Sequence, residues 1–217
     1  MPIFFQQDID ANTRLAIWKI EEGEEFFSRN VPLQQNITHP HKRLQHLAGR
    51  YLLQWLYPGF PIELIRIADT KKPFLEDEAY HFSISHCGDY AAVIVSTTNR
   101  VGIDIEMPSE KVKKIEGKFL HRDESVMLRK WSADNHLEYS TILWSAKEAM
   151  FKWWGLGKVD FSEMLRLHTH HPDEEGWLDG KFSRDDIHVA FPVHYKMFKG
   201  LMMAWVVTET SNVKRET

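Results

Sequence analysis

Two acidic residues, Asp104 and Glu106, lie two positions apart in an otherwise apolar segment, Val101–Glu106. The segment has the composition of a strand. Because side chains alternate along a strand, both carboxylates face one way while Ile103 and Ile105 face the other. Neighbouring carboxylates repel each other, and a cation between them relieves the repulsion. Oxygen ligands of this kind suit Mg²⁺, which takes one or two carboxylates together with substrate phosphates. The alternative is an exposed strand end whose charges are solvated.

A second segment, Trp144–Lys152, carries Glu148 and Lys152 on a predicted helix. Residues four apart lie on one face of a helix, so the carboxylate and the ammonium are neighbours. On an exposed surface such a pair contributes only about 0.3–0.5 kcal/mol. The many aromatic residues of this stretch predict that most of the helix is buried, which would hold the two charges in a cleft. An ordinary surface pair and a functional pair both remain open.

Ser85 and His86 close a predicted strand just before a glycine turn. Backbone N–H groups and an imidazole at such a turn could meet a phosphate. Cys87 is adjacent to His86, but neighbours on a strand point to opposite faces, so we exclude a Cys-His nucleophile pair. A single histidine near a turn is more often structural, and a functional role for His86 depends on the other residues.

The elements that would position these residues form two similar halves. The first half is predicted to contain two strands, a helix and a hairpin: 3–5 and 13–20, then 41–57, then 82–86 with 90–96. The second half is predicted to contain a strand, two helices and a hairpin: 101–106, then 123–131 and 137–154, then 194–198 with 201–207. We therefore expect an α+β fold of two subdomains, 1–98 and 99–217, each a helix packed on a small antiparallel sheet.

Composition limits the class of protein. Of the 217 residues, 43% are hydrophobic and 27% charged, which is typical of a globular chain and excludes wholesale disorder. A net charge of −4 argues against a general nucleic-acid binder. The apolar runs are too short to span a membrane, and the first residues lack the features of a signal peptide. The single cysteine excludes an internal disulfide and a C-x-x-C zinc site. We expect a reduced, cytoplasmic protein that does not enter the membrane.

Taken together, the three segments resemble the 4′-phosphopantetheinyl transferases of the surfactin-synthetase type. That family carries G-[IV]-D-[IVLT]-E and, some forty residues later, W-S-x-K-E-[AS]-x-x-K. Here these motifs correspond to Gly102–Glu106 and Trp144–Lys152. The family's S-H pair corresponds to Ser85-His86, and its upstream K-P to Lys72-Pro73. The resemblance covers about residues 40 to 158.

The resemblance implies a pseudo-dimer of two similar α+β halves in one chain. It also implies a reaction in which phosphopantetheine passes from coenzyme A to a serine of a carrier protein, releasing adenosine 3′,5′-bisphosphate. In this phosphoryl transfer, Asp104, Glu106 and Glu148 would hold Mg²⁺. Glu148 would also act, directly or through water, as the base that takes the serine proton. Lys152 would neutralise the phosphate charge that develops on the leaving side.

The resemblance also implies ligands for coenzyme A. Ser85 and His86 would contact its phosphates, and Lys71 and Lys72 its adenosine end. A solvated loop before Pro73 is the alternative for the two lysines. Further candidates for the 3′-phosphate are Arg43 and Arg50 on the first helix. Family members often have an extra basic residue upstream of this helix. Here the region reads Gln34-Gln35-Asn36, which leaves 3′-phosphate recognition open.

A basic segment between the two main motifs, 111–119, contains four lysines and three apolar residues. Carrier domains commonly present an acidic helix beside the target serine, so we expect docking here through Lys113, Lys114 and Phe119. The alternative is a solvated, lysine-rich loop. The chain length resembles the broad-specificity members of the family more than the shorter trimeric type, and we expect a monomer.

Two other classes of function remain as alternatives. One is a different Mg²⁺-dependent phosphotransferase or phosphohydrolase, which would turn over simple phosphate esters without a carrier protein. The other is a non-catalytic homologue that binds coenzyme A or the carrier. Such a homologue should have lost one of the three acids or Lys152, and the sequence retains all four.

Overall fold

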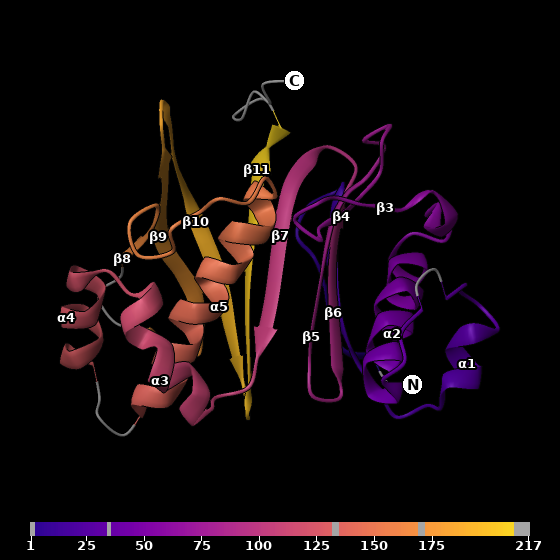
Figure 1. The fold of residues 1–217 in the computed structure, drawn as a ribbon, viewed down its shortest axis with the longest axis horizontal. Coiled ribbons are helices and arrows are strands. Elements are labelled where there is room, and N and C mark those ends of the chain that lie inside the picture. Colours follow the sequence, from indigo (N-terminus) through magenta and orange to yellow (C-terminus); the bar gives the residue numbers. More distant parts are fainter. Residues whose placement is uncertain (1–2, 34–35, 132–134, 169–171, 211–217) are drawn as a thin grey trace. The chain divides into compact units, whose positions relative to one another are not determined.

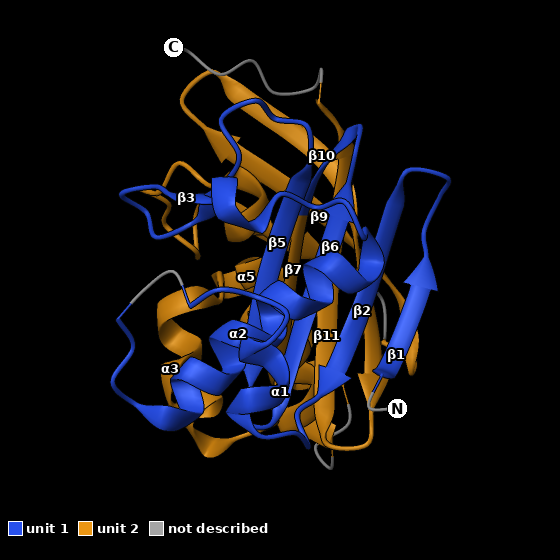
Figure 2. Ribbon diagram, turned by 90° about the vertical axis from the view of Figure 1, so that its right-hand side faces the viewer, with its two compact units in different colours: residues 1–101 blue, residues 102–217 orange. Residues whose placement is uncertain are grey.

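The computed structural model describes residues 3–33, 36–131, 135–168 and 172–210. They form two compact units, residues 1–101 and 102–217, which are coloured separately in Figure 2. Each unit combines helices with an antiparallel sheet, so the chain has the expected α+β class. Within the described part of the chain, no helix has both the length and the apolar composition needed to cross a bilayer.

Unit 1 is built around one long helix that packs on a four-stranded sheet (Figure 1). Its elements are β1 (Ile3–Asp8), β2 (Thr13–Lys19), α1 (Glu24–Ser28), α2 (Pro40–Leu56), the 3-10 helix η1 (Ile62–Leu64), β3 (Arg66–Ile67), β4 (Pro73–Phe74), β5 (His81–Cys87) and β6 (Tyr90–Ser96). The main sheet has the order β1-β2-β6-β5, and β3 and β4 form a separate small hairpin. The predicted strands, helix and hairpin of this half are confirmed.

Local sequence explains why α2 lies on this sheet. Pro40 stands at the start of the helix, where its missing N–H costs no intrahelical hydrogen bond. Apolar residues recur every three or four positions and bury one face, including Leu47, Leu52 and Leu56, against β2 and β6. Helix and sheet together enclose the core of unit 1.

Unit 2 repeats the plan with a five-stranded sheet and three helices. Its elements are β7 (Asn99–Glu106, which begins at the end of unit 1), α3 (Glu110–Phe119), α4 (Arg122–Lys130), α5 (His136–Trp154), β8 (Leu165–His168), β9 (Glu175–Arg184), β10 (Ile187–Phe198) and β11 (Leu201–Glu209). The sheet order is β7-β11-β10-β9-β8. The predicted strand, both helices and the final hairpin are confirmed, whereas α3, β8 and β9 were not predicted as elements.

Helix α5 is the centre of unit 2. It packs against β11, β10 and β8 on one side and against α3 and α4 on the other, which explains why it is apolar almost all round. Its C-cap is Gly155, in the left-handed conformation with φ of 77°, where glycine avoids the clash of a Cβ atom. The motif residues Glu148 and Lys152 lie in the last two turns of this buried helix.

Candidate active site

Strand β7 carries both motif carboxylates on one face, as the sequence predicted. Gly102, Asp104 and Glu106 alternate with Ile103 and Ile105, which are fully buried. Asp104 is also buried, at 5% exposure, while Glu106 at the end of the strand is half-buried. Gly102, Asp104 and Glu106 therefore define one face of β7, and this face lies towards α5.

Gly102 sets how close this strand comes to α5. A Cβ atom built on Gly102 would lie 2.1 Å from the carbonyl oxygen of Ala149 and 2.7 Å from the backbone nitrogen of Trp153. Only glycine allows backbone to approach backbone at this distance. The contact brings the last turns of α5 beside β7, and α5 is also tied to β11 because Trp153 Nε1 donates to Thr208 Oγ1 at 2.8 Å.

The strand–helix contact joins residues that lie 48 positions apart. Lys152 Nζ donates to Asp104 Oδ1 at 2.7 Å, and the two side chains are 25% and 7% exposed. Glu148 lies one helical turn before Lys152 and is half-buried. Burial raises the pKa of Glu148 to about 7, with a further increase from the charges of Asp104 and Glu106, and Lys152 opposes the increase. The structure thus brings together all four motif residues.

These four residues fit a divalent cation by charge and by chemistry. Three carboxylates face a single ammonium, so the group carries excess negative charge, and hard oxygen donors suit Mg²⁺. Among the described residues, however, no three acidic, histidine or cysteine side chains converge closely enough to hold an ion as they stand. The metal set Asp104, Glu106 and Glu148 therefore remains a prediction.

In unit 1, the predicted phosphate ligands Ser85 and His86 lie near the end of strand β5. Ser85 is 5% exposed and His86 is exposed. The charge of His86 acts on His46 of α2, whose pKa is lowered to about 4 by burial, then by Arg50 and then by His86. His86 therefore lies near α2, on the side that carries His46 and Arg50.

His46 is a candidate that sequence reasoning missed. It lies one helical turn before Arg50, and its Nδ1 is 3.1 Å from a guanidinium nitrogen of that residue. The spacing of four residues between a histidine and an arginine was the available signal, since such residues share a helix face. Burial also lowers the pKa of Arg50 to about 10. Arg50 and His46 of α2 and His86 of β5 thus lie near one another.

The two arginines proposed for the 3′-phosphate differ in their surroundings. Arg43 Nε donates to Glu24 Oε1 at 2.7 Å, and its NH1 donates to the carbonyl of Ile37 at 3.0 Å. These bonds tie α2 to α1 and give Arg43 a structural role. Arg50 is buried, at 5% exposure, and lies beside His46. Gln34 and Gln35 lie outside the described residues.

Lys71 and Lys72 lie in the turn of the β3–β4 hairpin. The Lys71 N–H donates to the carbonyl of Ala68, and the Ala68 N–H donates to that of Lys72. Lys71 has a φ of 65°, in the left-handed region that an L side chain enters at a cost of about 1–2 kcal/mol. A glycine would be more favourable at this position.

The basic segment 111–119 is a helix, α3, and not a loop. Its apolar residues Val112 and Phe119 face α5, while Lys113 and Lys114 are exposed. Phe119 is only 1% exposed, and its ring packs on Trp144 with centroids 5.0 Å apart. The prediction that Phe119 contacts the carrier is therefore wrong, because the residue is needed to close the core of unit 2.

Comparison with known proteins gives concordant matches. A family model described as the 4′-phosphopantetheinyl transferase superfamily matches residues 100–199. The 4′-phosphopantetheinyl transferase gsp of Aneurinibacillus migulanus is 32% identical over 141 residues, which cover 63% of this chain and 56% of that protein. The 4′-phosphopantetheinyl transferase AcpT of Escherichia coli K12 is 28% identical over 137 residues, covering 60% of this chain and 70% of AcpT.

The matches cover only part of the relatives and part of this chain. The alignment spans little more than half the length of gsp. On this chain, the family match takes in β7 and α5, and with them Asp104, Glu106, Glu148 and Lys152. Through this segment the chain is similar to the 4′-phosphopantetheinyl transferase superfamily.

Proposed function

We propose that this protein transfers 4′-phosphopantetheine from coenzyme A to a serine hydroxyl of an acyl or peptidyl carrier protein. The observation that carries the proposal is the pairing of Asp104 with Lys152 beside Glu148, inside the segment that matches the family. In the reaction, the serine oxygen forms a bond to the β-phosphorus of coenzyme A. The bond from that phosphorus to the bridging oxygen breaks, releasing adenosine 3′,5′-bisphosphate.

The residues of unit 2 would carry the chemistry. Asp104, Glu106 and Glu148 would hold Mg²⁺, which when bound would neutralise charge on the pyrophosphate. Glu148 would accept the proton of the attacking serine, directly or through water. Lys152, held by Asp104 at 2.7 Å, would offset charge developing on the leaving phosphate.

The residues of unit 1 would bind coenzyme A. Ser85 and His86 would contact its phosphates, and Lys71 and Lys72 its adenosine end. Arg50 is favoured over Arg43 for the 3′-phosphate, because Glu24 already engages Arg43.

The two units have a topological similarity that supports an origin by duplication. In unit 1, the strand before the long helix (β2) lies beside the second strand of the hairpin that follows it (β6). In unit 2, β7 and β11 have the same relation around α5. We infer that the chain is a pseudo-dimer, acting as a cytoplasmic monomer.

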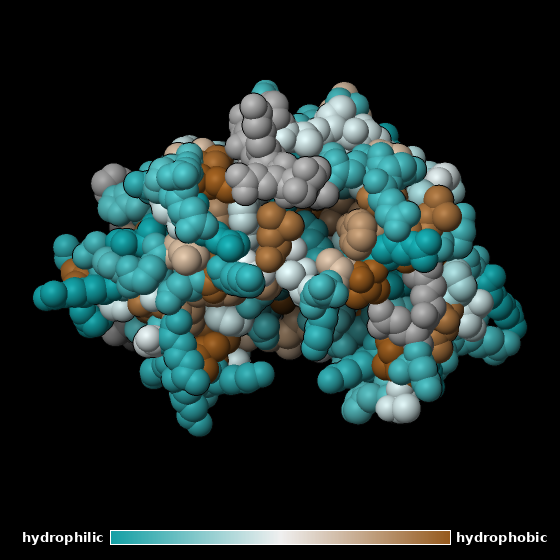
Figure 3. All heavy atoms as spheres, turned by 45° about the horizontal axis from the view of Figure 1, so that its top comes forward, coloured by the Kyte–Doolittle hydropathy of each residue, from teal (hydrophilic) through white to brown (hydrophobic). Residues whose placement is uncertain are grey.

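The carrier protein would dock on the exposed faces of α3 and α4. Residues 110–130 contain seven basic and four acidic side chains, a net charge of +3 in a chain whose total is −4. Three of the acids are engaged within unit 2: Glu116 with His136, Asp123 with Arg166, and Glu124 with Lys147. The side of unit 2 where α3 and α4 lie is covered mainly by hydrophilic residues in Figure 3 (left). Such a surface suits an acidic partner, and Lys113 and Lys114 are exposed on it.

Mass spectrometry of apo carrier proteins incubated with the protein, coenzyme A and Mg²⁺ tests the reaction. Transfer adds one phosphopantetheinyl group, a gain of about 340 Da. We expect Asp104→Ala and Glu148→Ala to abolish the gain with the circular dichroism spectrum intact, and Asp186→Ala, which removes an exposed acid elsewhere in unit 2, to retain it. No mass gain on any carrier, with simple phosphate esters hydrolysed instead, would establish the phosphohydrolase alternative.

A further inference from the structure

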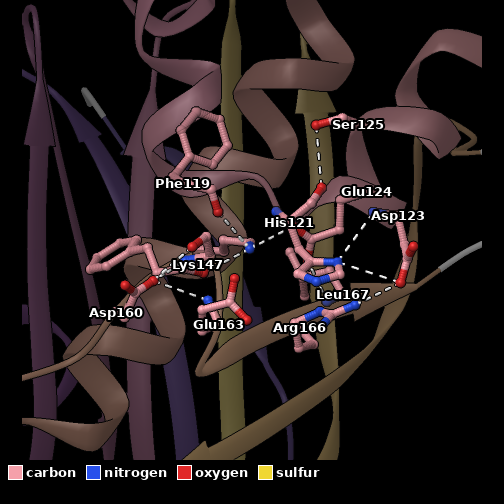
Figure 4. Close-up of polar contacts among 12 residues, drawn as sticks. Phe119, His121, Asp123, Glu124, Ser125, Lys147, Asp160, Glu163, Arg166 and Leu167 are labelled. Atoms are coloured by element: carbon pink, nitrogen blue, oxygen red, sulfur yellow. Dashed lines mark hydrogen bonds and ion pairs between the residues drawn. The ribbon is translucent and has the colours of Figure 1, made fainter.

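A buried ion pair lies next to the active-site residues in the sequence but has no part in the proposed chemistry. Lys147 directly precedes Glu148 in α5, and its side chain is 0% exposed. Its partner is Glu124 of α4, which is 1% exposed, with Nζ and Oε2 2.6 Å apart. Figure 4 shows the amino group of Lys147 directed towards Phe119 and Glu124.

Lys147 uses all three of its N–H donors within this buried network. Besides Glu124, Nζ donates to the carbonyl of Phe119 at 2.7 Å and to that of Phe161 at 2.8 Å. The three acceptors belong to the end of α3, to α4 and to the loop after α5. One side chain of α5 is thus bonded to three separate segments.

Glu124 extends the network to a fourth segment. Its Oε1 accepts from the backbone N–H of Leu167 in β8 at 2.8 Å, and its Oε2 accepts from the N–H of His121 at the start of α4 at 2.7 Å. The carboxylate therefore fixes the first turn of α4 and the edge strand of the sheet to the same ammonium.

The loop that supplies the Phe161 carbonyl is itself ordered. Asp160 Oδ1 accepts from the N–H and the hydroxyl of Ser162 and from the N–H of Glu163, at 2.8–3.0 Å. The Phe161 ring stacks on Trp144 of α5 with centroids 5.7 Å apart. These contacts hold the Phe161 carbonyl in place independently of its hydrogen bond to Lys147.

A buried ion pair is a poor way to stabilise a fold, because the cost of desolvating two charges offsets most of their attraction. It is an effective way to fix geometry, because a fully satisfied ammonium tolerates little displacement of its three acceptors. Residues 147 and 148 are adjacent on the helix, so fixing the direction of the first side chain fixes the rotation of the second about the helix axis.

We propose that Lys147 and Glu124 are positioning residues that set the rotation and axial position of α5, and thereby of Glu148 and Lys152 relative to Asp104. This inference rests on the proposed transfer reaction for its catalytic consequence. Phosphoryl transfer depends on placing groups to within a fraction of an ångström, so a small rotation of α5 should lower turnover strongly.

The test separates positioning from stability by comparing a single with a double variant. Lys147→Met leaves Glu124 buried without its ion partner and should destabilise the fold. Lys147→Met/Glu124→Leu replaces the pair by apolar side chains and should recover most of the unfolding free energy. We expect the double variant to keep a kcat at least tenfold below the wild type, with the KM for coenzyme A changed by less than about threefold.

Peptide-level amide hydrogen exchange gives a second readout that does not need the reaction. Peptides covering 148–154 should exchange faster in both variants, while peptides from α2 should be unchanged. Lys147→Arg keeps the positive charge and the N–H donors, so its kcat should lie between that of Lys147→Met and that of the wild type. Should the double variant fail to fold, Glu124→Gln, which preserves side-chain volume, takes its place: it should destabilise the fold because Lys147 loses its ion partner, and the 148–154 peptides should still exchange faster than in the wild type.

A double variant whose kcat returns with its stability, and whose 148–154 peptides exchange at the wild-type rate, would overturn the inference. If the wild type transfers no phosphopantetheine, the proposed function fails, and the exchange data alone still decide whether the pair orders the end of α5.

Discussion

Two titratable side chains, Lys147 and His46, respond differently to burial. Lys147 donates to three acceptors that belong to separate segments. Burial lowers the pKa of Lys147, and the charge of Glu124 opposes this lowering. His46 is compensated in a different way, by staying neutral: its Nε2 is buried and has no hydrogen-bond partner among the described residues. Burial and the charge of Arg50 lower its pKa to about 4. A buried histidine of this kind makes stability depend on pH.

We predict that the protein loses stability on acidification because of His46. Its folded pKa of about 4 lies below the ordinary value of 6.5, so the unfolded chain binds the proton first. The contribution of neutral His46 to the free energy of unfolding is complete above about pH 6.5 and is lost as the pH falls towards 4. The full shift corresponds to about 3.4 kcal/mol, and partial exposure reduces it to about 1–2 kcal/mol.

Urea unfolding at about pH 7.5 and pH 4.5 measures this effect. The loss of unfolding free energy between the two pH values should be smaller by about 1–2 kcal/mol in His46→Gln than in the wild type. His41→Gln, which changes an exposed histidine on the same helix, is the control and should behave as the wild type. Equal losses in all three proteins would show that His46 does not carry the pH dependence.

At the scale of elements, the contact between β7 and α5 decides whether the site exists. Neither element holds all the motif residues, and the strand must approach the helix backbone before Asp104 can reach Lys152. The same helix is held from the opposite side by the Lys147 network. The site is therefore a product of how α5 is packed, more than of any one side chain.

We predict that Gly102→Ala destabilises the protein by about 3 kcal/mol, because the added methyl would overlap the backbone of α5. Transfer activity should fall with it, since relieving the overlap moves β7 away from Glu148. Gly117→Ala in α3 is the matched control: a Cβ there meets nothing within 4 Å, and removing a helix glycine should stabilise by about 0.5–1 kcal/mol. Denaturant unfolding measures the free energy of unfolding of both variants. If Gly102→Ala unfolds with the wild-type free energy, the close contact between β7 and α5 is contradicted.

At the scale of the whole molecule, charge is distributed unevenly along the chain. The net charge of −4 conceals the positive segment that forms α3 and α4, whose lysines point outward while its apolar residues complete the core of unit 2. An acidic partner would be attracted to this surface and repelled by the rest of the chain, which favours one docking orientation.

We predict that Lys113→Glu/Lys114→Glu raises the KM for an acidic carrier on the order of tenfold and leaves the KM for coenzyme A unchanged. Added salt should raise the KM of the wild type for the carrier more than that of the variant. Lys181→Glu/Lys199→Glu makes the same change of net charge at exposed positions elsewhere in unit 2. If this control raises the KM for the carrier equally, net charge and not α3 is responsible.

Local pattern was enough to predict most elements and the face shared by Asp104 and Glu106, because strand alternation and helix periodicity are properties of adjacent residues. The motifs also predicted the family to which residues 100–199 are similar. Helix α3 was missed because its lysines obscured the apolar spacing of Val112, Ile115 and Phe119, and β8 and β9 lack strong runs of β-branched residues. Phe119 was assigned to the surface because sequence does not say which apolar residues meet.

Contacts between distant residues were decided by tertiary structure alone. Three sets of contacts join segments separated by 14 to 48 positions. They are the hydrogen bond between Lys152 and Asp104, the effect of His86 on the pKa of His46, and the hydrogen bonds of Lys147 to Phe119, Glu124 and Phe161. The sequence by itself determined which residues could do chemistry and on which faces they would lie. Only packing determined which of them meet, because charge and pKa depend on burial and on neighbours that no local pattern specifies.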